Sequence, residues 1–269
     1  MKLLDWLITH FLNHTVLWRK ESQGLITVER FRREDKLVIK RNHKTLSGIY
    51  LSTSEPTSQL YWFPHLADLF QYKPKRILSL GGGACVYPTH LVKKNKSVVV
   101  DVLELDPAVI EAAKKFFAVP VSSRLKLIQG DGREFLLQSR RASYDLIFID
   151  VGITLTRKLP RYNTQFLDAG AFDGYVRALR KNGTLMFNIM TTLSRQDEKY
   201  VSKQLRQFIE HFPVHLIFKV TEGELNTKVQ DSIHVFSQQP ISVADMRKKL
   251  ELQPRNLSYS RDKYLYVLN

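Results

Sequence analysis

The 269-residue sequence has a single cysteine, Cys85. An intramolecular disulfide is therefore excluded, and we expect a cytoplasmic protein because disulfide-free chains are typical of reducing compartments. A zinc site of the usual cysteine and histidine kind would need further cysteines. The histidines supply no such site either, since His10 and His14 have ligand spacing but no third ligand in view. We expect no metal.

The sequence also lacks an uncharged apolar run of the roughly 18 residues that a membrane-spanning helix needs. Its most apolar segment, residues 1–18, is interrupted by Asp5, and no small-residue cleavage site follows. We therefore expect neither a transmembrane segment nor a signal peptide. Apolar residues in this segment recur at helical spacing and predict a helix docked on the protein body or on a second subunit. An interfacial membrane helix is the alternative. The residues at this spacing are Leu4, Leu7, Ile8, Phe11 and Thr15.

Acidic residues are few relative to basic ones. The 26 Asp and Glu against 41 Lys and Arg give a formal net charge of +15. This excess is compatible with nucleic acid or an acidic partner. No nucleic-acid-binding motif accompanies it, and the basic segment 19–44 has few interleaved aromatic residues on which bases could stack. The charge therefore names no partner by itself.

From residue 76 onward, apolar strands alternate with helices, which predicts a parallel sheet covered on both faces. The last two strands are joined without a helix and predict an antiparallel edge pair. Residues 24–52 predict three short strands ahead of the sheet. The later strands are predicted at 76–80, 97–105, 124–129, 144–150, 183–190, 214–220 and 231–237, and the helices at 88–94, 107–117, 132–139, 165–180, 195–211 and 242–251.

These patterns predict an α/β chain in two parts. Residues 1–70 hold the N-terminal helix and a small β segment. Residues 71–269 hold a doubly wound, mostly parallel sheet. In such sheets ligands bind beyond the carboxyl ends of the strands.

Chemistry-bearing residues follow the first four strands of the second part. Consecutive glycines let the backbone approach a ligand, and a helix with free N–H groups follows them. A carboxylate at Glu104, 21 residues after Gly83, can accept both hydroxyls of a ribose. Helix capping is the alternative, and it suits Asp106, ahead of Pro107, better. The candidates are Gly81, Gly82 and Gly83 after the first strand, Glu104 at the end of the second, Asp131 and Gly132 after the third, and Asp150 at the end of the fourth.

The last two carboxylates have two interpretations each. Asp131, between two glycines, can accept a hydrogen bond from an exocyclic adenine amine or cap a helix. Asp150 lies where a reacting group would be, or is a structural strand-end acid. Val86 stands where a G-x-G-x-x-G fingerprint has its third glycine, which argues against a nicotinamide dinucleotide.

Four segments, ILSLGGGA, VVVDVLELDPAVIEAAKKFF, RLKLIQGDGREFL and YDLIFID, carry a family resemblance. They resemble the spermidine synthase-like (polyamine aminopropyltransferase) branch of the class I S-adenosylmethionine-dependent methyltransferase superfamily. The resemblance covers residues 24–190 and is strongest over 76–150. It implies a seven-stranded Rossmann-like methyltransferase sheet, S-adenosylmethionine or its decarboxylated form as co-substrate, and a small-molecule acceptor. Related enzymes are often dimers, so the N-terminal helix is a candidate homodimer contact.

The resemblance also implies roles for the candidate residues. The three glycines, 81–83, would lie along the amino-acid or aminopropyl tail of the ligand. Glu104 would bind the ribose, and Asp131 would face the adenine. Asp150 matches the first Asp of the family's D-x-x-D motif, the proposed base that deprotonates an attacking amine.

Two departures from the aminopropyltransferase pattern bear on the reaction. Ala84 replaces the acid of G-G-G-D-G, and Ile153 replaces the second Asp of D-x-x-D. The loop 151–164, which should cover the substrate pocket, contains Arg157, Lys158 and Arg161 and no acid. A polyamine is a multiple cation that needs carboxylates around it, so these features favour methyl transfer. The alternatives are an aminopropyltransferase that makes spermidine and methylthioadenosine, and a catalytically degenerate basic binding module.

Overall fold

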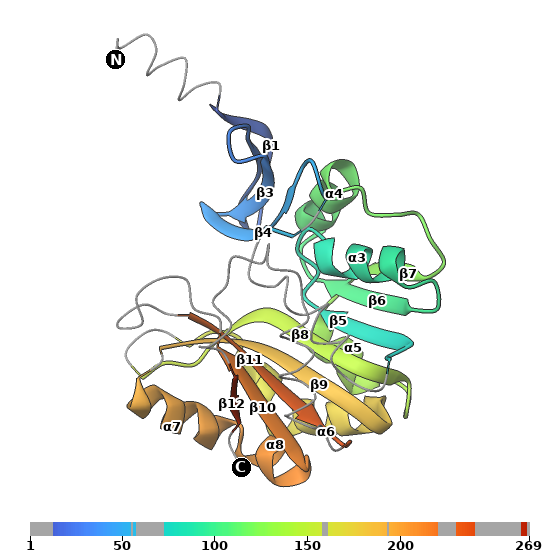
Figure 1. The fold of residues 1–269 in the computed structure, drawn as a ribbon, viewed down its shortest axis with the longest axis vertical. Helices are drawn as coiled ribbons and strands as arrows, with labels where there is room; N and C mark the ends of the chain where they lie inside the picture. Colours follow the sequence, from blue (N-terminus) through green and yellow to red (C-terminus); the bar gives the residue numbers. More distant parts are fainter. Residues whose placement is uncertain are drawn as a thin grey trace. The chain divides into compact units, whose positions relative to one another are not determined.

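The computed structural model describes residues 13–54, 56–57, 73–157, 161–192, 194–219, 230–239 and 265–267. The chain forms two compact units, whose helices and strands are labelled in Figure 1. Unit 1 comprises Met1–His65 and Gly81–Asp131, and unit 2 comprises Leu66–Leu80 and Gly132–Asn269. Among the described residues, none of the helices combines the length and apolarity that crossing a membrane requires. The predicted helix at 242–251, the boundary at 70/71 and most of the predicted N-terminal helix lie outside the described residues.

Unit 1 begins with a four-stranded antiparallel sheet in the order β1-β2-β3-β4, called here the N-terminal sheet. Its strands are β1 (His14–Ser22), β2 (Gly24–Phe31), β3 (Lys36–Arg41) and β4 (Lys44–Tyr50). The three predicted strands are confirmed as β2, β3 and β4. The helical prediction was wrong for Thr15, which lies in β1 and pairs with Arg30 of β2. Most of β1 is exposed, so no buried face marked it as a strand in the sequence.

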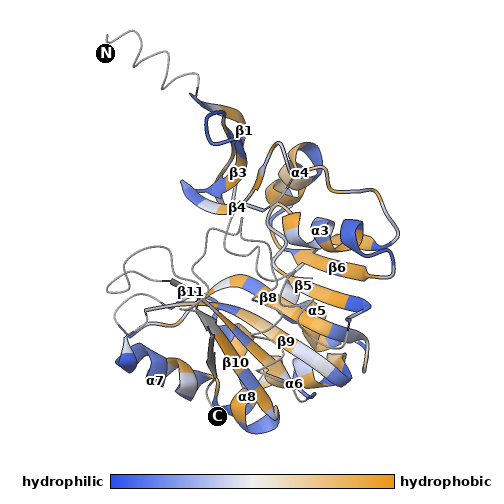
Figure 2. Cartoon of the chain, viewed as in Figure 1, coloured by the Kyte–Doolittle hydropathy of each residue, from blue (hydrophilic) through white to orange (hydrophobic). Residues whose placement is uncertain are grey.

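The rest of unit 1 consists of α3 (Val86–Lys94), β6 (Val99–Glu104), α4 (Pro107–Phe116) and β7 (Leu125–Gln129), with β6 and β7 paired in parallel. Figure 2 shows β6 as predominantly apolar. The N-terminal sheet shares one hydrophobic core with α4 and the start of α3. That core contains Ile26, Val28, Leu37, Ile39, Ala84, Val86, Ala108, Val109, Ala112 and Phe117.

Unit 2 holds six strands in the order β12-β10-β11-β9-β8-β5. The pairs β5–β8 and β8–β9 are parallel, and β9–β11, β11–β10 and β10–β12 are antiparallel, which confirms the predicted edge pair. The strands are β5 (Arg76–Leu80), β8 (Tyr144–Thr154), β9 (Leu179–Thr191), β10 (Val214–Lys219), β11 (Gln230–Ser237) and β12 (Leu265–Val267). The helices are α5 (Gly132–Gln138), η2 (Thr164–Leu167), α6 (Ala169–Ala178), α7 (Arg195–Gln204) and α8 (Arg206–His211).

Two predicted helices of unit 2 are divided. The helix expected at 165–180 is split into η2 and α6, because the side chain of Asp168 caps α6 by accepting a hydrogen bond from the Ala171 N–H. The helix expected at 195–211 is split into α7 and α8 at Leu205. The predicted mostly parallel α/β fold is otherwise confirmed, and the short strand β12 is an addition to the seven strands predicted.

Candidate functional site

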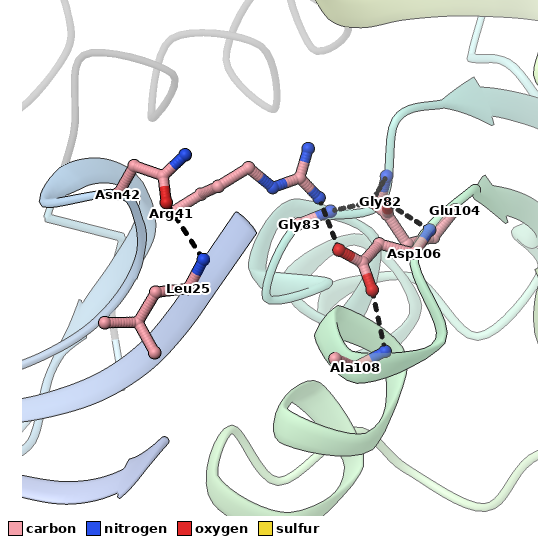
Figure 3. Close-up of polar contacts among 8 residues, drawn as sticks. All are labelled: Leu25, Arg41, Asn42, Gly82, Gly83, Glu104, Asp106 and Ala108. Atoms are coloured by element: carbon pink, nitrogen blue, oxygen red, sulfur yellow. Dashed lines mark hydrogen bonds and ion pairs between the residues drawn. The ribbon is translucent and has the colours of Figure 1, made fainter. Parts of the chain in front are cut away.

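The glycine turn after β5 is hydrogen-bonded to the end of β6 within unit 1. The N–H groups of Gly82 and Gly83 donate to one carboxylate oxygen of Glu104, Oε2, at 3.1 and 2.9 Å (Figure 3). The N–H of Gly81 donates to the Leu103 carbonyl at 2.9 Å. The structure thus brings the glycines and Glu104 together, as their places at neighbouring strand ends predict.

Glycine is required in this turn for two separate reasons. Gly81 and Gly83 have φ angles of 90° and 48°, which L side chains rarely adopt. At Gly82 the reason is space, because a Cβ atom would lie 3.1 Å from both the Glu104 Cβ and the Val102 Cγ1. A side chain there would push Glu104 away from the turn.

Glu104 is almost fully buried, with 9% of its surface exposed. Its second oxygen, Oε1, accepts a hydrogen bond from the Asp106 N–H at 3.0 Å. An ionised carboxylate offers about four acceptor positions, so three N–H donors leave capacity for a ligand hydroxyl. The carboxylate is therefore oriented by the backbone and still able to bind.

Asp106 caps α4, as the sequence predicts, by accepting a hydrogen bond from the Ala108 N–H at 2.9 Å. Its side chain is fully buried and forms an ion pair with Arg41 at 2.8 Å. Burial alone would raise the pKa of Asp106. Hydrogen bonds from Ser22, Ala108 and Gln23 and the positive charge of Arg41 outweigh burial and lower the pKa below its ordinary value.

Asp131 and Gly132 follow β7. Asp131 is exposed at the end of unit 1. The turn that carries it is tied to β6, since the Gly130 N–H donates to the Glu104 carbonyl at 3.0 Å. Gly132 opens α5 in unit 2, and a Cβ there would lie 3.3 Å from the Leu80 side chain.

Asp150 lies in β8 of unit 2 and has a partner that sequence reasoning missed. The side-chain amide of Asn188, on β9, donates from Nδ2 to Asp150 Oδ1 at 3.0 Å. Asn188 is only 5% exposed, and its Oδ1 has no hydrogen-bond partner in the part of the chain that the structure describes. The position of this asparagine inside the apolar run TLMFNIM could have indicated a polar partner nearby, because buried amides require hydrogen-bond partners.

The two departures from the aminopropyltransferase pattern are both buried. Ala84 and Ile153 are each 0% exposed, and Ile153 pairs with Ile189 of β9. The segment predicted as a loop from 151 begins as a continuation of β8 to Thr154, with an irregular pairing after Ile149.

The cations of this segment contact α7. Arg157 donates to the Gln196 side chain at 2.7 Å, and Arg161 donates to the Tyr200 hydroxyl at 2.7 Å. Both arginines are exposed, and Lys158 lies outside the described residues. The structure therefore gives no support to the expectation that these charges oppose a cationic substrate. The preference for methyl transfer then depends on Ala84 and Ile153.

Cys85 initiates α3 in a left-handed conformation with φ of 57°. Burial raises the pKa of its thiol to about 12, so the thiol is not a nucleophile at neutral pH. The described residues contain no group of three or more His, Cys, Asp or Glu that could hold a metal ion.

Residues 62–221, more than half of the chain, match the family model of the spermine/spermidine synthase domain. The chain is 33% identical over 116 residues to the spermine synthase of Arabidopsis thaliana, a match that covers 42% of this chain and 31% of the relative. It is 26% identical over 116 residues to putrescine N-methyltransferase 1 of Nicotiana tabacum, covering 42% of this chain and 30% of the relative. The chain thus spans about a third of the length of these curated relatives.

Among solved structures, a probable spermidine synthase from Corynebacterium glutamicum ATCC 13032 is similar with a TM-score of 0.71. The identity is 20%, and the match covers 88% of this chain and 87% of that one. At that identity the likeness shows the fold alone, and it confirms the predicted Rossmann-like methyltransferase architecture.

Proposed function

This chain belongs to the spermine/spermidine synthase family, and from that premise we propose that it is a transferase that binds S-adenosylmethionine or its decarboxylated form and modifies a small amine. Methyl transfer is the favoured reaction, and aminopropyl transfer, with spermidine and methylthioadenosine as products, is the alternative. A cytoplasmic homodimer remains a prediction.

The geometry of unit 1 supports the proposed ligand. Gly81, Gly82 and Gly83 form a turn whose backbone a ligand can approach closely. Glu104 lies against this turn, and its Oε1 keeps acceptor capacity for a ribose hydroxyl. In this proposal Asp131 faces the adenine, and Gly132 is a further cofactor-binding residue.

Asp150 and Asn188 are the residues that we assign to the acceptor amine. Asn188 Nδ2 holds one oxygen of the Asp150 carboxylate at 3.0 Å. The buried Asn188 Oδ1 lacks a partner among the described residues, so an amine N–H would satisfy it. In this proposal Asp150 takes the proton of the amine.

The reaction is an in-line displacement at a sulfonium carbon. The amine nitrogen attacks the methyl carbon, the carbon–sulfur bond breaks, and its electron pair stays on sulfur as S-adenosylhomocysteine forms. The proton leaves the amine for Asp150. Much of the rate would come from alignment of the two reactants.

The observation that favours methyl transfer is the fully buried Ala84 at the glycine turn. Decarboxylated S-adenosylmethionine carries a cationic aminopropyl group, and a carboxylate at this position would pair with it. Ala84 supplies no charge, and the buried Ile153 removes a second carboxylate of the D-x-x-D pattern. Both losses weaken the attraction for polycations.

Calorimetric titration with S-adenosylmethionine, decarboxylated S-adenosylmethionine and 5′-methylthioadenosine tests the proposal. We expect binding of the first and third, and mass spectrometry should detect a methylated product when small amines are supplied as acceptors. Asp150→Asn should bind the donor unchanged and lose turnover. Spermidine formed from the decarboxylated donor would instead establish the alternative. Binding of none of the three would refute an S-adenosyl transferase and leave the basic binding module, which salt-dependent retention on nucleic acid would support.

A further inference from the structure

Arg41 connects the N-terminal sheet to the turn that presents Glu104. It lies at the end of β3, beside a turn in which the Leu25 N–H donates to Asn42 Oδ1 at 2.9 Å. Its guanidinium extends to the start of α4, where Nη2 lies 2.8 Å from Asp106 Oδ2 (Figure 3). About 31% of the Arg41 side chain is exposed, whereas the Asp106 side chain has no exposed surface. The buried carboxylate therefore has a cation at hydrogen-bond distance.

Asp106 in turn is bonded to Glu104, since the Asp106 N–H donates to Glu104 Oε1 at 3.0 Å. Two buried carboxylates two residues apart repel each other unless a cation compensates them. Removal of Arg41 would leave the Asp106 charge buried without its ion pair, which is costly. Asp106 would then keep only its hydrogen bonds from Ser22, Ala108 and Gln23, and a shift of its carboxylate toward water would alter the turn that holds Glu104.

The position of the N-terminal sheet does not itself depend on Arg41. Ile26, Val28 and Ile39 of the sheet pack with Ala108 and Val109 of α4 in one hydrophobic core. This apolar contact should keep the sheet on α4 when the ion pair is removed. The effect of Arg41 can therefore be measured in a folded protein.

We propose that Arg41 is a positioning residue for the S-adenosyl ligand: through Asp106 it holds the turn in which Glu104 receives the ribose. This inference rests on the proposed function and adds the N-terminal sheet to the ligand site. Because Arg41 acts on the ribose-binding carboxylate, its loss weakens every ligand that contains the adenosine ribose, with or without an amino-acid tail.

The experiment compares Arg41→Gln with Lys20→Gln. Lys20 forms an exposed ion pair with Glu111 at 2.7 Å, so it also joins the N-terminal sheet to α4, but it does not contact Asp106. The dissociation constants of S-adenosylmethionine and of 5′-methylthioadenosine are measured by calorimetry, and the melting temperature of each variant is recorded.

We expect Arg41→Gln to weaken both ligands equally, by about tenfold, which corresponds to about 1.4 kcal/mol. Lys20→Gln should leave both affinities within about twofold, as expected for an exposed ion pair. Arg41→Lys keeps the charge beside Asp106 and should recover part of the affinity. If the glutamine variant does not fold, Arg41→Met replaces it as the variant without the charge.

Three results would overturn the inference. Unchanged affinities in the folded Arg41→Gln and Arg41→Lys proteins would show that the ion pair is only structural. A loss confined to S-adenosylmethionine would place Arg41 at the amino-acid tail and not behind the ribose. An equal loss in Lys20→Gln would assign the effect to docking of the sheet in general. Failure of the wild-type protein to bind either ligand would refute the proposed function itself, a result distinct from all three.

Discussion

Acidification should destabilise unit 2 through two hydrogen-bonded histidines on its antiparallel strands, of which His234 is buried and His215 is half-buried. His215 Nε2 lies 3.1 Å from His234 Nδ1, and Ser232 Oγ lies 3.1 Å from His234 Nε2. The Ser232 hydroxyl donates to the Ile189 carbonyl at 2.9 Å, so its oxygen accepts from His234. His234 Nδ1 then accepts from His215, and the chain of hydrogen bonds is complete with both imidazoles neutral.

Burial lowers the pKa of His215 from its ordinary 6.5 to about 4. His215 also stacks on Phe236 with ring centroids 4.3 Å apart, and this contact replaces water on one face of the imidazole. The unfolded chain binds a proton near pH 6.5, and the folded chain does so only near pH 4. Stability from this group is therefore complete above the unfolded pKa and is lost as the pH falls from about 6.5 to about 4.

The size of this loss follows from the two pKa values. A tenfold difference in proton affinity is worth about 1.4 kcal/mol, so the full effect is about 3 kcal/mol. Urea unfolding at several pH values between 7.5 and 4.5 would measure it, with His215→Gln as the variant that cannot titrate. The wild-type protein should lose about 2–3 kcal/mol more than His215→Gln over this range.

A control variant, His43→Asn, removes an exposed histidine and should keep the wild-type pH dependence. Parallel stability curves for wild type and His215→Gln would refute the reasoning. They would mean that the folded and unfolded chains bind the proton at the same pH, and hence that burial does not keep His215 neutral.

Three further predictions concern the candidate site. Gly82→Ala places a Cβ 3.1 Å from Glu104 and Val102 and should weaken calorimetric binding of S-adenosylmethionine by about tenfold; unchanged affinity would show that Glu104 does not need its place against the turn. Asn188→Ala should lower kcat by about tenfold with little change in donor affinity, since it leaves Asp150 without an orienting amide; a fall in donor affinity alone would remove Asn188 from the acceptor side. The Cys85 thiol should resist iodoacetamide in the native protein at pH 8, because burial raises its pKa to about 12; rapid alkylation seen by mass spectrometry would contradict this.

Local patterns predicted the parts of the site that depend on neighbours in the sequence. Gly82, Glu104 and the cap at Asp106 could be placed from the strand ends and the Asp-Pro pair, because those features follow from local backbone geometry. Arg41 could not be found in this way. Its ion pair joins residues 65 positions apart. The neighbouring sequence does not distinguish Arg41 from the other basic residues of the segment 19–44.

The same limit explains the other omissions. Asn188 contacts Asp150 only because β8 and β9 pair in parallel with a register that places Ile149 opposite Phe187. Strand β1 was missed because it is held by pairing with β2 and not by a buried face of its own. Element types were thus predictable from periodicity, whereas partners across strands required the register.

Glu104 is held in place before any ligand binds. Three backbone N–H groups fix this carboxylate in the protein without help from a ligand. An ordinary long side chain loses about 0.5–1.5 kcal/mol of rotamer freedom when a ligand immobilises it. Glu104 has already lost that freedom on folding, so more of its interaction with a ligand hydroxyl is retained as affinity. The glycine turn thus preorganises Glu104 for binding. The rotamer freedom of this side chain is lost during folding, so the loss lowers the stability of the fold and not the affinity for the ligand.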